Sequence, residues 1–581
     1  MKSGIVILSL LVSFTGMSQN FSKVTGNLLT NLPGDSRSVN WVDINHDGFV
    51  DCFISNGPSG GQNNTMFIND GAGGFVLLED DPIVSDGEPS DGATFADIDN
   101  DGDLDAFVVN WYNRHNLAYI NDGTGHFTRL TQGQWVTNSG FSETAAFGDY
   151  DQDGLVDLYV TNSDGISRNF LYRNQNGEIF ERIGEGDMVT DQAASRNVNW
   201  IDIDADGDVD LFVTNEQGQK EQLYRNDGGG VFEAVSTTAL TSGTFSTMSS
   251  SWADMDNDGD LDVFLATNGT KNQLYRNDGN MNFIPITDSE VTEKITRSFS
   301  CAWADIDNDG DQDLFVTNAF GSSRLKNNLY INDGHGVFSE VTEGALVMDD
   351  GWSYGCAFGD YDNDGFQDLA VATTRYGGED EANYLYHNEG NGHHWIMFSL
   401  EGSISNRSAI GTIVRVKAFI NGQLIWQMRE VSSQSAYCGQ NDMRPHFGLG
   451  DATIVDSVII EWPSGIVQYM TNLQVDQIYP VKEEFVNTVE EVSDAMSLSV
   501  FPNPTDSNLQ ISGYADSPFE KLMIKLVRMD GEIVYASEQQ ISSGNWKLEI
   551  NLSDSFIVAG TYILHVRQGE NEEVRKILLI N

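Results

Sequence analysis

One acidic pattern recurs between residues 43 and 368 of this 581-residue chain. It reads Asp-x-Asp-x-Asp-Gly-x-x-Asp, with side-chain oxygens at positions 1, 3, 5 and 9 and a glycine at position 6. An EF-hand loop binds Ca²⁺ through similarly spaced oxygens and adds a backbone carbonyl at position 7. Hard carboxylate oxygens in this number suit Ca²⁺ better than Mg²⁺, which demands a tighter octahedron and keeps more water.

Seven copies are present, numbered here loops 1 to 7, and their starts lie 51 to 55 residues apart. The predicted metal ligands are the side chains at positions 1, 3, 5 and 9: Asp43, Asn45, Asp47 and Asp51; Asp97, Asp99, Asp101 and Asp105; Asp149, Asp151, Asp153 and Asp157; Asp202, Asp204, Asp206 and Asp210; Asp254, Asp256, Asp258 and Asp262; Asp305, Asp307, Asp309 and Asp313; Asp360, Asp362, Asp364 and Asp368. The alternative is a solvated acidic turn without an ion. Because carboxylates this close repel one another, seven copies in register favour the metal, up to seven Ca²⁺ in all.

Short strands must position these loops. An apolar run follows each loop, and then a second signature, clearest as Leu223-Tyr224-Arg225-Asn226-Asp227-Gly228. No stretch of the repeat shows a long helical period, so each unit of roughly fifty residues predicts a small antiparallel sheet. Seven such sheets could stack as an open array or close into a propeller.

A phenylalanine decides between these two architectures. In repeats 2 to 7 it stands 22 residues before the acidic loop, and Phe21 stands 22 residues before loop 1. The seventh repeat lacks this piece after Leu385-Tyr386-His387-Asn388. The chain start therefore carries the strand that the last repeat lacks, which predicts an all-β fold with a closed seven-bladed β-propeller over residues 19–395.

These motifs resemble the FG-GAP/VCBS repeats, the propeller family that includes the integrin α head. The resemblance implies that each acidic loop lies between the first two strands of a blade and binds Ca²⁺, with a structural role.

Two small β-sandwich or barrel-like domains are expected after the propeller. Residues 396–483 carry Asn406-Arg407-Ser408-Ala409-Ile410-Gly411, His446-Phe447-Gly448-Leu449-Gly450 and Glu461-Trp462-Pro463-Ser464-Gly465. This order resembles the ASPIC/UnbV domain of the cartilage acidic protein family, although Cys438 stands where a serine is expected. Residues 484–497 are acidic and indicate a linker.

Residues 498–581 begin with Leu498-Ser499-Val500-Phe501-Pro502-Asn503-Pro504 and resemble a type IX secretion sorting domain of type A. That resemblance implies engagement with the type IX secretion machinery and export to the outer surface of a Bacteroidota-like bacterium. An ordinary small β-sandwich used for adhesion is the alternative.

The net charge and the N-terminal segment limit the partners and the cellular location that the sequence allows. The net charge of −56 argues against nucleic acid and anionic lipid as partners. Residues 1–18 are predicted to be a secretory signal peptide, and no other stretch approaches the length of a membrane span. The cysteines Cys52, Cys301, Cys356 and Cys438 fit no zinc or redox motif, and Cys301 and Cys356 are either core thiols or bridged.

No catalytic motif is convincing. Gly57-Pro58-Ser59-Gly60-Gly61 has the letters of a nucleophile elbow but no helical pattern after it. The sequence therefore predicts a secreted or cell-surface calcium-binding propeller that recognises a protein or glycan. Trp111, Tyr112 and Trp135 are candidate sugar-stacking aromatics, and packing in the core is the alternative for each. The alternative is a carbohydrate-active enzyme that uses an acidic propeller channel.

Overall fold

A computed structural model describes residues 20–164, 168–177, 179–484, 499–501, 508–515, 520–528, 533–541, 544–551, 560–568 and 571–579. The predicted signal peptide and residues 485–497 of the predicted linker lie outside these ranges. The chain divides into two compact units, residues 1–484 and 485–581, and each is described by itself.

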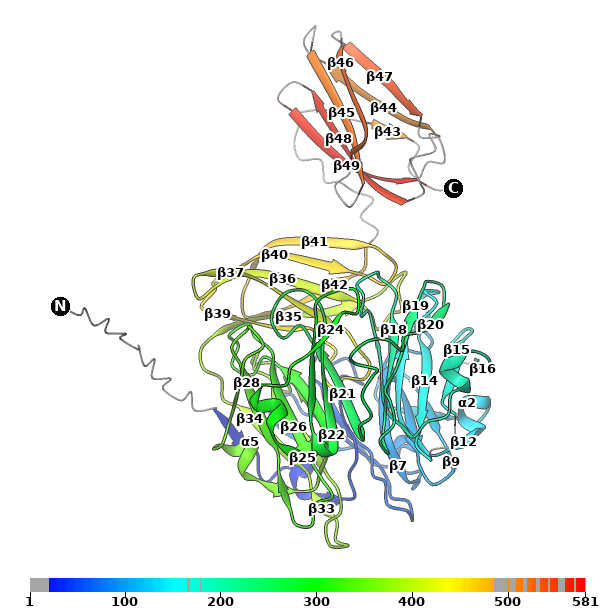
Figure 1. Ribbon diagram of the computed structural model, residues 1–581, viewed down its shortest axis with the longest axis vertical. Coiled ribbons are helices and arrows are strands. Elements are labelled where there is room, and N and C mark those ends of the chain that lie inside the picture. The colour runs from blue at the N-terminus through cyan, green and yellow to red at the C-terminus, as the bar shows by residue number, and fades with distance from the viewer. Residues whose placement is uncertain are drawn as a thin grey trace, which may run out of the picture. The chain divides into compact units, whose positions relative to one another are not determined.

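The first unit contains seven four-stranded antiparallel blades arranged around a central axis (Figure 1). From the innermost strand outward, the blades are: β3 (Val39–Val42), β4 (Asp51–Ile54), β5 (Thr65–Asn69), β6 (Phe75–Leu77); β7 (Ser90–Ala96), β8 (Asp105–Asn110), β10 (Leu117–Asn121), β11 (Phe127–Leu130); β13 (Ser142–Gly148), β14 (Asp157–Asn162), β15 (Phe170–Asn174), β16 (Phe180–Ile183); β17 (Ser195–Ile201), β18 (Asp210–Asn215), β19 (Gln222–Asn226), β20 (Phe232–Ala234); β21 (Thr247–Ala253), β22 (Asp262–Lys271), β23 (Gln273–Asn277), β24 (Phe283–Pro285); β25 (Ile295–Ala304), β26 (Asp313–Asn318), β28 (Asn328–Asn332), β29 (Phe338–Glu340); β31 (Ser353–Gly359), β32 (Asp368–Thr373), β34 (Tyr384–Asn388), β1 (Phe21–Lys23).

The seventh blade is completed by the start of the chain, as the phenylalanine spacing predicts. Phe21 pairs with Asn388 and Lys23 with Tyr386, so β1 lies antiparallel on the outer side of β34. The open array is therefore wrong, and the closed propeller is confirmed. Closure leaves no unpaired edge between the first and last repeats.

Short helices and two-residue strand pairs complete the propeller. The helices, each four residues long or shorter and none able to cross a bilayer, are α1 (Leu28–Asn31), η1 (Pro82–Val84), α2 (Gln134–Thr137), α3 (Asp187–Thr190), α4 (Glu290–Glu293) and α5 (Ala345–Met348). The pairs join neighbouring blades: β2 (Pro33–Gly34) with β33 (Glu381–Ala382), β9 (Arg114–His115) with β12 (Ser139–Gly140), and β27 (Leu325–Lys326) with β30 (Asp350–Gly351).

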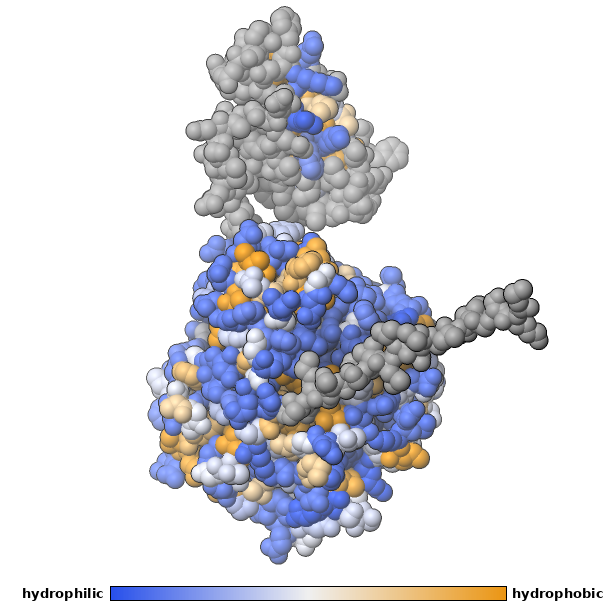
Figure 2. Space-filling model, turned by 90° about the vertical axis from the view of Figure 1, so that its left-hand side faces the viewer, coloured by the Kyte–Doolittle hydropathy of each residue, from blue (hydrophilic) through white to orange (hydrophobic). Residues whose placement is uncertain are grey.

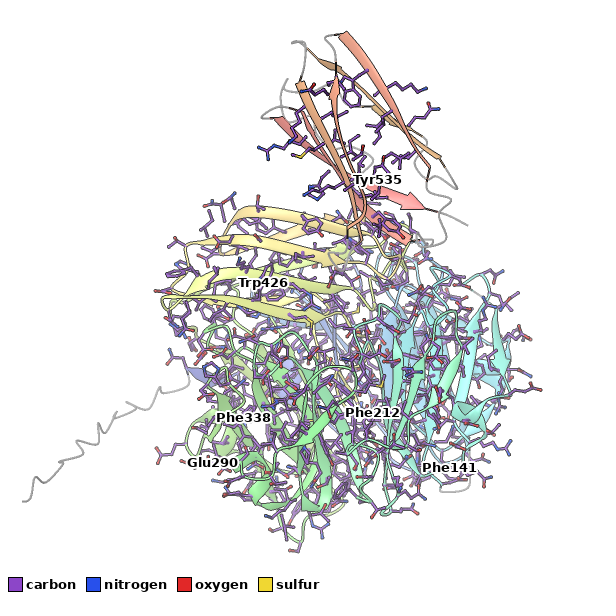
Figure 3. The ribbon with its side chains drawn as sticks, turned by 45° about the horizontal axis from the view of Figure 1, so that its top comes forward. Phe141, Phe212, Glu290, Phe338, Trp426 and Tyr535 are labelled. Atoms are coloured by element: carbon purple, nitrogen blue, oxygen red, sulfur yellow. The ribbon has the colours of Figure 1, made fainter. Side chains whose placement is uncertain are left out.

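Residues 394–484, here called the cap, form two sheets that lie over one face of the propeller (Figure 1). One sheet has the order β39-β35-β42 and the other β37-β36-β40-β41. Their bounds are β35 (His394–Glu401), β36 (Ile413–Ile420), β37 (Gln423–Glu430), β39 (His446–Gly450), β40 (Ile454–Glu461), β41 (Val467–Gln474) and β42 (Gln477–Lys482). Trp426 of β37 lies on the four-stranded sheet of the cap (Figure 3).

The cap sends one loop, residues 431–445, into the central channel; we call it the channel loop. It contains the short strand β38 (Gly439–Gln440), which pairs in parallel with β3. The innermost strand of every blade hydrogen-bonds this loop, through Val39, Thr94, Phe147, Asn199, Ser251, Ser300 and Phe358. These bonds satisfy backbone and side-chain groups that the channel would otherwise bury unpaired.

The second unit contains two further sheets, β43-β44-β47 and β46-β45-β48-β49. Their strands are β43 (Ser499–Phe501), β44 (Asn508–Ala515), β45 (Glu520–Arg528), β46 (Ile533–Ile541), β47 (Gly544–Asn551), β48 (Gly560–Gln568) and β49 (Asn571–Leu579). A core that includes Leu509, Ile524 and Leu564 lies between them.

The view of the first unit in Figure 2 is mostly hydrophilic, with scattered apolar side chains. This surface agrees with the strongly negative net charge of the chain.

Candidate metal centres

Each acidic loop connects the innermost strand of a blade to the second strand, as the family resemblance implies. Loop 2 shows the local geometry. The two carboxylate oxygens of Asp97 accept from the backbone N–H groups of Asp101 at 3.1 Å and Gly102 at 2.8 Å. Gly102 has a φ of +109°, a conformation that favours glycine and explains the invariant residue type at position 6.

The carboxylate at position 9 ties the loop to the rest of its blade. Asp105 accepts from the N–H of Ile98 at 3.0 Å and from the N–H of Asn121 at 2.8 Å. The side-chain amide of Asn121 in turn donates to the carbonyl of Ile44, in loop 1 of the preceding blade, at 2.8 Å.

The same two bonds recur at every position equivalent to Asn121, namely Asn69, Asn174, Asn226, Asn277, Asn332 and Asn388. This asparagine belongs to the second signature of each repeat, for which the sequence alone predicts no role. Its recurrence in all seven repeats was the available signal.

Carboxylate oxygens converge within the loops. In several loops three ligand atoms lie within 4.8 Å of one another, as in the groups Asp97–Asp99–Asp101 and Asp254–Asp256–Asp262. One oxygen of the position-3 carboxylate is buried without a hydrogen-bond partner in five loops, at Asp151, Asp204, Asp256, Asp307 and Asp362. A buried carboxylate oxygen without a partner is costly, and a divalent cation would satisfy it. These clusters could therefore bind metal ions.

Burial disfavours the charged form of these carboxyl groups when no metal is present. It raises the pKa of Asp97 to about 7, that of Asp105 to about 8 and that of Asp262 to about 9. Backbone hydrogen bonds oppose the rise, and neighbouring aspartates add to it. The metal-free loops thus hold protons that a cation would displace.

Three loops depart from the common arrangement. In loop 1 the amide of Asn45 donates to Asp47 at 3.1 Å. In loop 3 the guanidinium of Arg173 contacts Asp151 at 2.6 Å, and in loop 7 His387 contacts Asp368 at 3.1 Å. In loop 2 the guanidinium of Arg407 lies farther away, 3.9 Å from Asp97. A cationic side chain beside a candidate ligand carboxylate competes with a metal ion, most strongly at the shorter distances of loops 3 and 7.

Hydrogen bonds connect consecutive loops around the ring. The side chain at position 4 donates to the glycine carbonyl of the next loop, as Asn308 does to Gly365 at 3.0 Å. Five loops make this bond, through Asn100, Gln152, Asn257, Asn308 and Asn363. In loop 1, His46 contacts Asp103 at 2.7 Å instead. In loop 4, Ala205 holds the position and cannot donate.

The cap contacts the loops with arginine side chains. Arg444 donates to the carbonyl of Asp360 at 3.1 Å, and Arg415 reaches the carbonyl of Gly259 at 3.5 Å. The backbone N–H of Arg407 donates to Asn100 at 3.0 Å. The face that carries the acidic loops is therefore the face that the cap covers.

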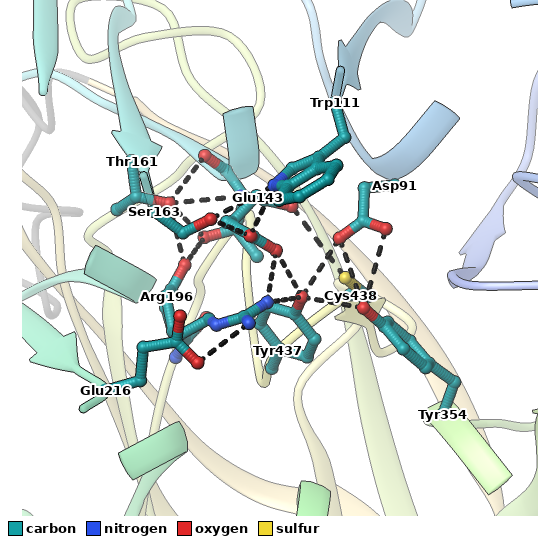
Figure 4. Close-up of polar contacts among 12 residues, drawn as sticks. Asp91, Trp111, Glu143, Thr161, Ser163, Arg196, Glu216, Tyr354, Tyr437 and Cys438 are labelled. Carbon is teal, nitrogen blue, oxygen red and sulfur yellow. Dashed lines mark hydrogen bonds and ion pairs between the residues drawn. The ribbon is translucent and has the colours of Figure 1, made fainter. Parts of the chain in front are cut away.

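A second polar cluster lies at the far end of the channel, around the tip of the channel loop (Figure 4). The hydroxyl of Tyr437 contacts Glu143 at 2.6 Å, Asp91 at 2.9 Å and Tyr354 at 2.9 Å. Arg196 forms an ion pair with Glu143 at 2.6 Å. Burial, followed by the charge of Glu143, raises the pKa of Asp91 to about 8. Although burial opposes its ionisation, Arg196 lowers the pKa of Glu143.

The candidate stacking aromatics differ in exposure. Tyr112 is 41% exposed, and Trp111 is half-buried with its indole N–H bonded to Glu143 at 2.8 Å. For Trp135 the core-packing alternative is confirmed and sugar stacking is wrong, because this side chain is fully buried and stacks on Phe107 and Phe180. Two aromatic neighbours in the blade core draw it inward.

The cysteines, residues 57–61 and His446 complete the chemical candidates. Cys301 and Cys356 are both free, buried thiols, so the bridged alternative is wrong. Residues 57–61 lie between β4 and β5, with no helix after them as a nucleophile elbow would need. The ring Nε2–H of His446 donates to the carbonyl of Gly365 at 3.0 Å, and burial lowers the pKa of His446 to about 3. Its packed position agrees with a structural role.

Family models match most of the chain. The model described as FG-GAP-like repeat matches residues 43–108, 97–160, 149–213, 202–265, 254–316 and 305–371. The chain belongs to the FG-GAP-like repeat proteins. The model described as ASPIC and UnbV matches residues 402–487, and that described as Secretion system C-terminal sorting domain matches residues 499–581. FG-GAP and UnbV domains are not typical enzyme domains, and with the sorting domain they support a secreted or outer-surface protein.

Distant relatives are known in animals. Cartilage acidic protein 1 of Mus musculus is 25% identical over 362 residues, which cover 58% of this chain and 52% of the relative. The Homo sapiens protein is 25% identical over 55% of this chain and 47% of its own length. The chain thus spans about half the length of these relatives. A solved tetra-tandem repeat from the extending region of a large adhesion protein is 11% identical and covers 93% of this chain and 98% of its own, but its TM-score of 0.13 supports no statement about fold.

Proposed function

We propose that this FG-GAP protein is a calcium-stabilised recognition module, exported by type IX secretion, that binds a protein or glycan outside the cell. The observation that carries the calcium part is the set of buried, unpartnered carboxylate oxygens at position 3 of five loops. The ligands are the side chains at positions 1, 3, 5 and 9 of each loop, named above. The bound ions hold the loops in the conformation that the cap contacts, so their role is structural.

The recognition surface is the propeller face opposite the cap, where β33, β9 and β12 lie (Figure 1). The cap contacts the other face, and the channel loop fills the channel between them. Aromatic side chains cluster on the opposite face: the rings of Trp111 and Tyr112 lie 4.6 Å apart, and those of Trp352 and Tyr376 lie 5.1 Å apart. Half-buried aromatic side chains on loops suit recognition of a sugar ring or an apolar side chain.

The test is a binding screen of the secreted chain against a glycan array and host-type extracellular proteins, with Ca²⁺ and EDTA arms. We expect saturable, calcium-dependent binding that Tyr112→Ala weakens. Tyr469→Ala is the control on the cap, because the side chain of Tyr469 is 68% exposed, and it should leave binding unchanged. A polysaccharide panel run in parallel tests turnover. Cleavage of a polysaccharide by the pure protein would replace the recognition function with the enzymatic alternative.

A further inference from the structure

A cavity of about 140 Å³, partly open to solvent, lies between the propeller and the cap. Blades 5, 6 and 7 contribute Trp252, Gln312 and Gln367 to its wall, and the cap contributes Arg429, Glu430 and Gln434. An apolar cavity of similar size in another protein stays dry and holds benzene. This cavity has space for a molecule of that size, but its wall is polar.

Several polar groups of this wall are buried without a hydrogen-bond partner. They include two donors, the indole Nε1 of Trp252 and the amide Nε2 of Gln367, and two acceptors, Oε2 of Glu430 and Oε1 of Gln434. Gln367 is only 6% exposed and Gln434 only 1%. Native proteins leave few buried polar groups unpaired, and a cluster of them around one cavity indicates an absent partner.

The unpaired indole N–H of Trp252 distinguishes blade 5 from the other blades that have a tryptophan at the same position. Three tryptophans occupy the position equivalent to Trp252, and each donates its indole N–H to a carbonyl of the preceding blade: Trp41 to Ala357, Trp200 to Ala146 and Trp303 to Ser251, at 3.1–3.2 Å. Trp252 alone lacks this bond.

Position 8 of the acidic loops also distinguishes two blades that line the cavity, 6 and 7, from the other five. Five loops carry an apolar residue there, namely Val50, Leu104, Val156, Val209 and Leu261. Loops 6 and 7 carry Gln312 and Gln367, and both line the cavity.

The wall also holds charges of both signs. The guanidinium of Arg429 bonds neutral groups, the carbonyl of Met428 at 2.8 Å and the side chain of Gln427 at 3.2 Å. Within the described residues, no carboxylate lies within ion-pair distance of Arg429. The carboxylate of Glu430 bonds only the N–H of Asp202, at 3.4 Å, and pairs with no described cation. Asp254, Asp305 and Asp311 act on Arg429 through their charge without forming an ion pair with it, and burial raises the pKa of Glu430 well above its usual range. A carboxylate beside Arg429 and an ammonium group beside Glu430 would each supply an ion-pair partner that the buried side chain now lacks.

From this wall we infer that the cavity binds a small zwitterion of amino-acid size. Its carboxylate accepts from Arg429, Trp252 and Gln367, and its ammonium group donates to Glu430 and Gln434. Residues 442–444 of the channel loop line both this cavity and a second one of about 570 Å³.

Calorimetric titration of the full mature chain in saturating Ca²⁺ tests the inference, with glycine, L-alanine and L-serine as separate probes. Acetate and methylammonium, each carrying one of the two charges, are the control probes at the same ionic strength. The inference expects saturable binding of at least one amino acid and at least tenfold weaker binding of both control probes.

Two substitutions borrowed from other repeats test the site itself. Trp252→Phe places at this position the phenylalanine that other blades carry at the equivalent positions 95, 147 and 358. Gln367→Val likewise places the valine found at the equivalent positions 50, 156 and 209, so both variants should fold. Each is expected to weaken binding about tenfold, because each removes one donor. Trp200→Phe is the matched control, since Trp200 does not line the cavity, and it should bind like the parent.

Three results would overturn the inference: no saturable binding of any of the three amino acids, equal binding of acetate, or undiminished binding in both cavity variants. A crystal soaked in the tightest-binding amino acid and showing only water in the cavity would do the same.

Discussion

Ala205 interrupts the ring of hydrogen bonds between the acidic loops, and restoring the missing donor tests whether that ring stabilises the propeller. Ala205 has a φ of +59°, which is unfavourable for a residue with a Cβ but well tolerated by asparagine. Asn257, at the same position of the next loop, has a φ of +58° and donates to Gly310. We therefore expect Ala205→Asn to donate to the carbonyl of Gly259.

The expected gain combines two effects. A net hydrogen bond contributes about 0.5–1.5 kcal/mol, and asparagine relieves part of the left-handed backbone cost of about 1–2 kcal/mol. Ala205→Asn should thus raise the free energy of unfolding by about 1–2 kcal/mol, or the melting temperature by about 2 °C in a unit of this size.

Ala205→Gly is the matched control, because glycine relieves the backbone but offers no amide. Its gain is offset by about 0.5–1 kcal/mol of extra unfolded-state entropy, so it should be nearly neutral. Differential scanning calorimetry in Ca²⁺ compares the three proteins. Equal melting temperatures for Ala205→Asn and Ala205→Gly would refute the stabilising role of the ring.

Three further predictions concern the loops, the channel and the ring closure. In EDTA, the free energy of unfolding should fall between pH 5 and 8, by about 1.4 kcal/mol per pH unit for each carboxyl such as Asp105. The pKa of Asp105 is raised to about 8 in the folded protein, so its contribution to stability is complete below the pKa of the unfolded chain and is lost as the pH rises through 8. Urea denaturation at several pH values measures this loss. An equal loss of stability in EDTA and in Ca²⁺ would contradict the prediction. Tyr437→Phe should cost about 1–3 kcal/mol, because it leaves buried Glu143 and Asp91 short of a partner, whereas the exposed control Tyr469→Phe should cost nothing measurable in the same assay. Deleting residues 20–24 should lower the melting temperature and cause self-association on size exclusion, because it exposes the edge of β34; a monomer with unchanged melting would count against closure by β1.

The sequence predicts the parts of this fold that repeat. The 22-residue spacing from Phe21 to loop 1 predicts the closing strand, because a displaced copy of a repeated element has no other use in a ring. The acidic loops are predicted for the same reason, whereas their place between the first two strands is implied by the resemblance to FG-GAP/VCBS repeats. Because the pattern occurs seven times, its copies can be aligned with one another, and the shared positions then stand out.

Features that occur once could not be predicted. The channel loop joins Tyr437 to Asp91 and Glu143, residues about three hundred positions away, and nothing periodic marks that contact. Sugar stacking and core packing stay open for Trp135 from the sequence, because local sequence does not show the stacking partners Phe107 and Phe180. The connecting role of Asn121 depends on the packing of one blade against the next, which spacing alone does not define.

The most direct measurement for the central claim is the melting curve of the mature chain before and after chelation, with bound metal counted by elemental analysis. The account predicts several Ca²⁺ per chain, a substantially lower melting temperature once EDTA has removed them, and recovery when Ca²⁺ is restored. An unchanged melting curve in a sample proven free of metal would contradict it.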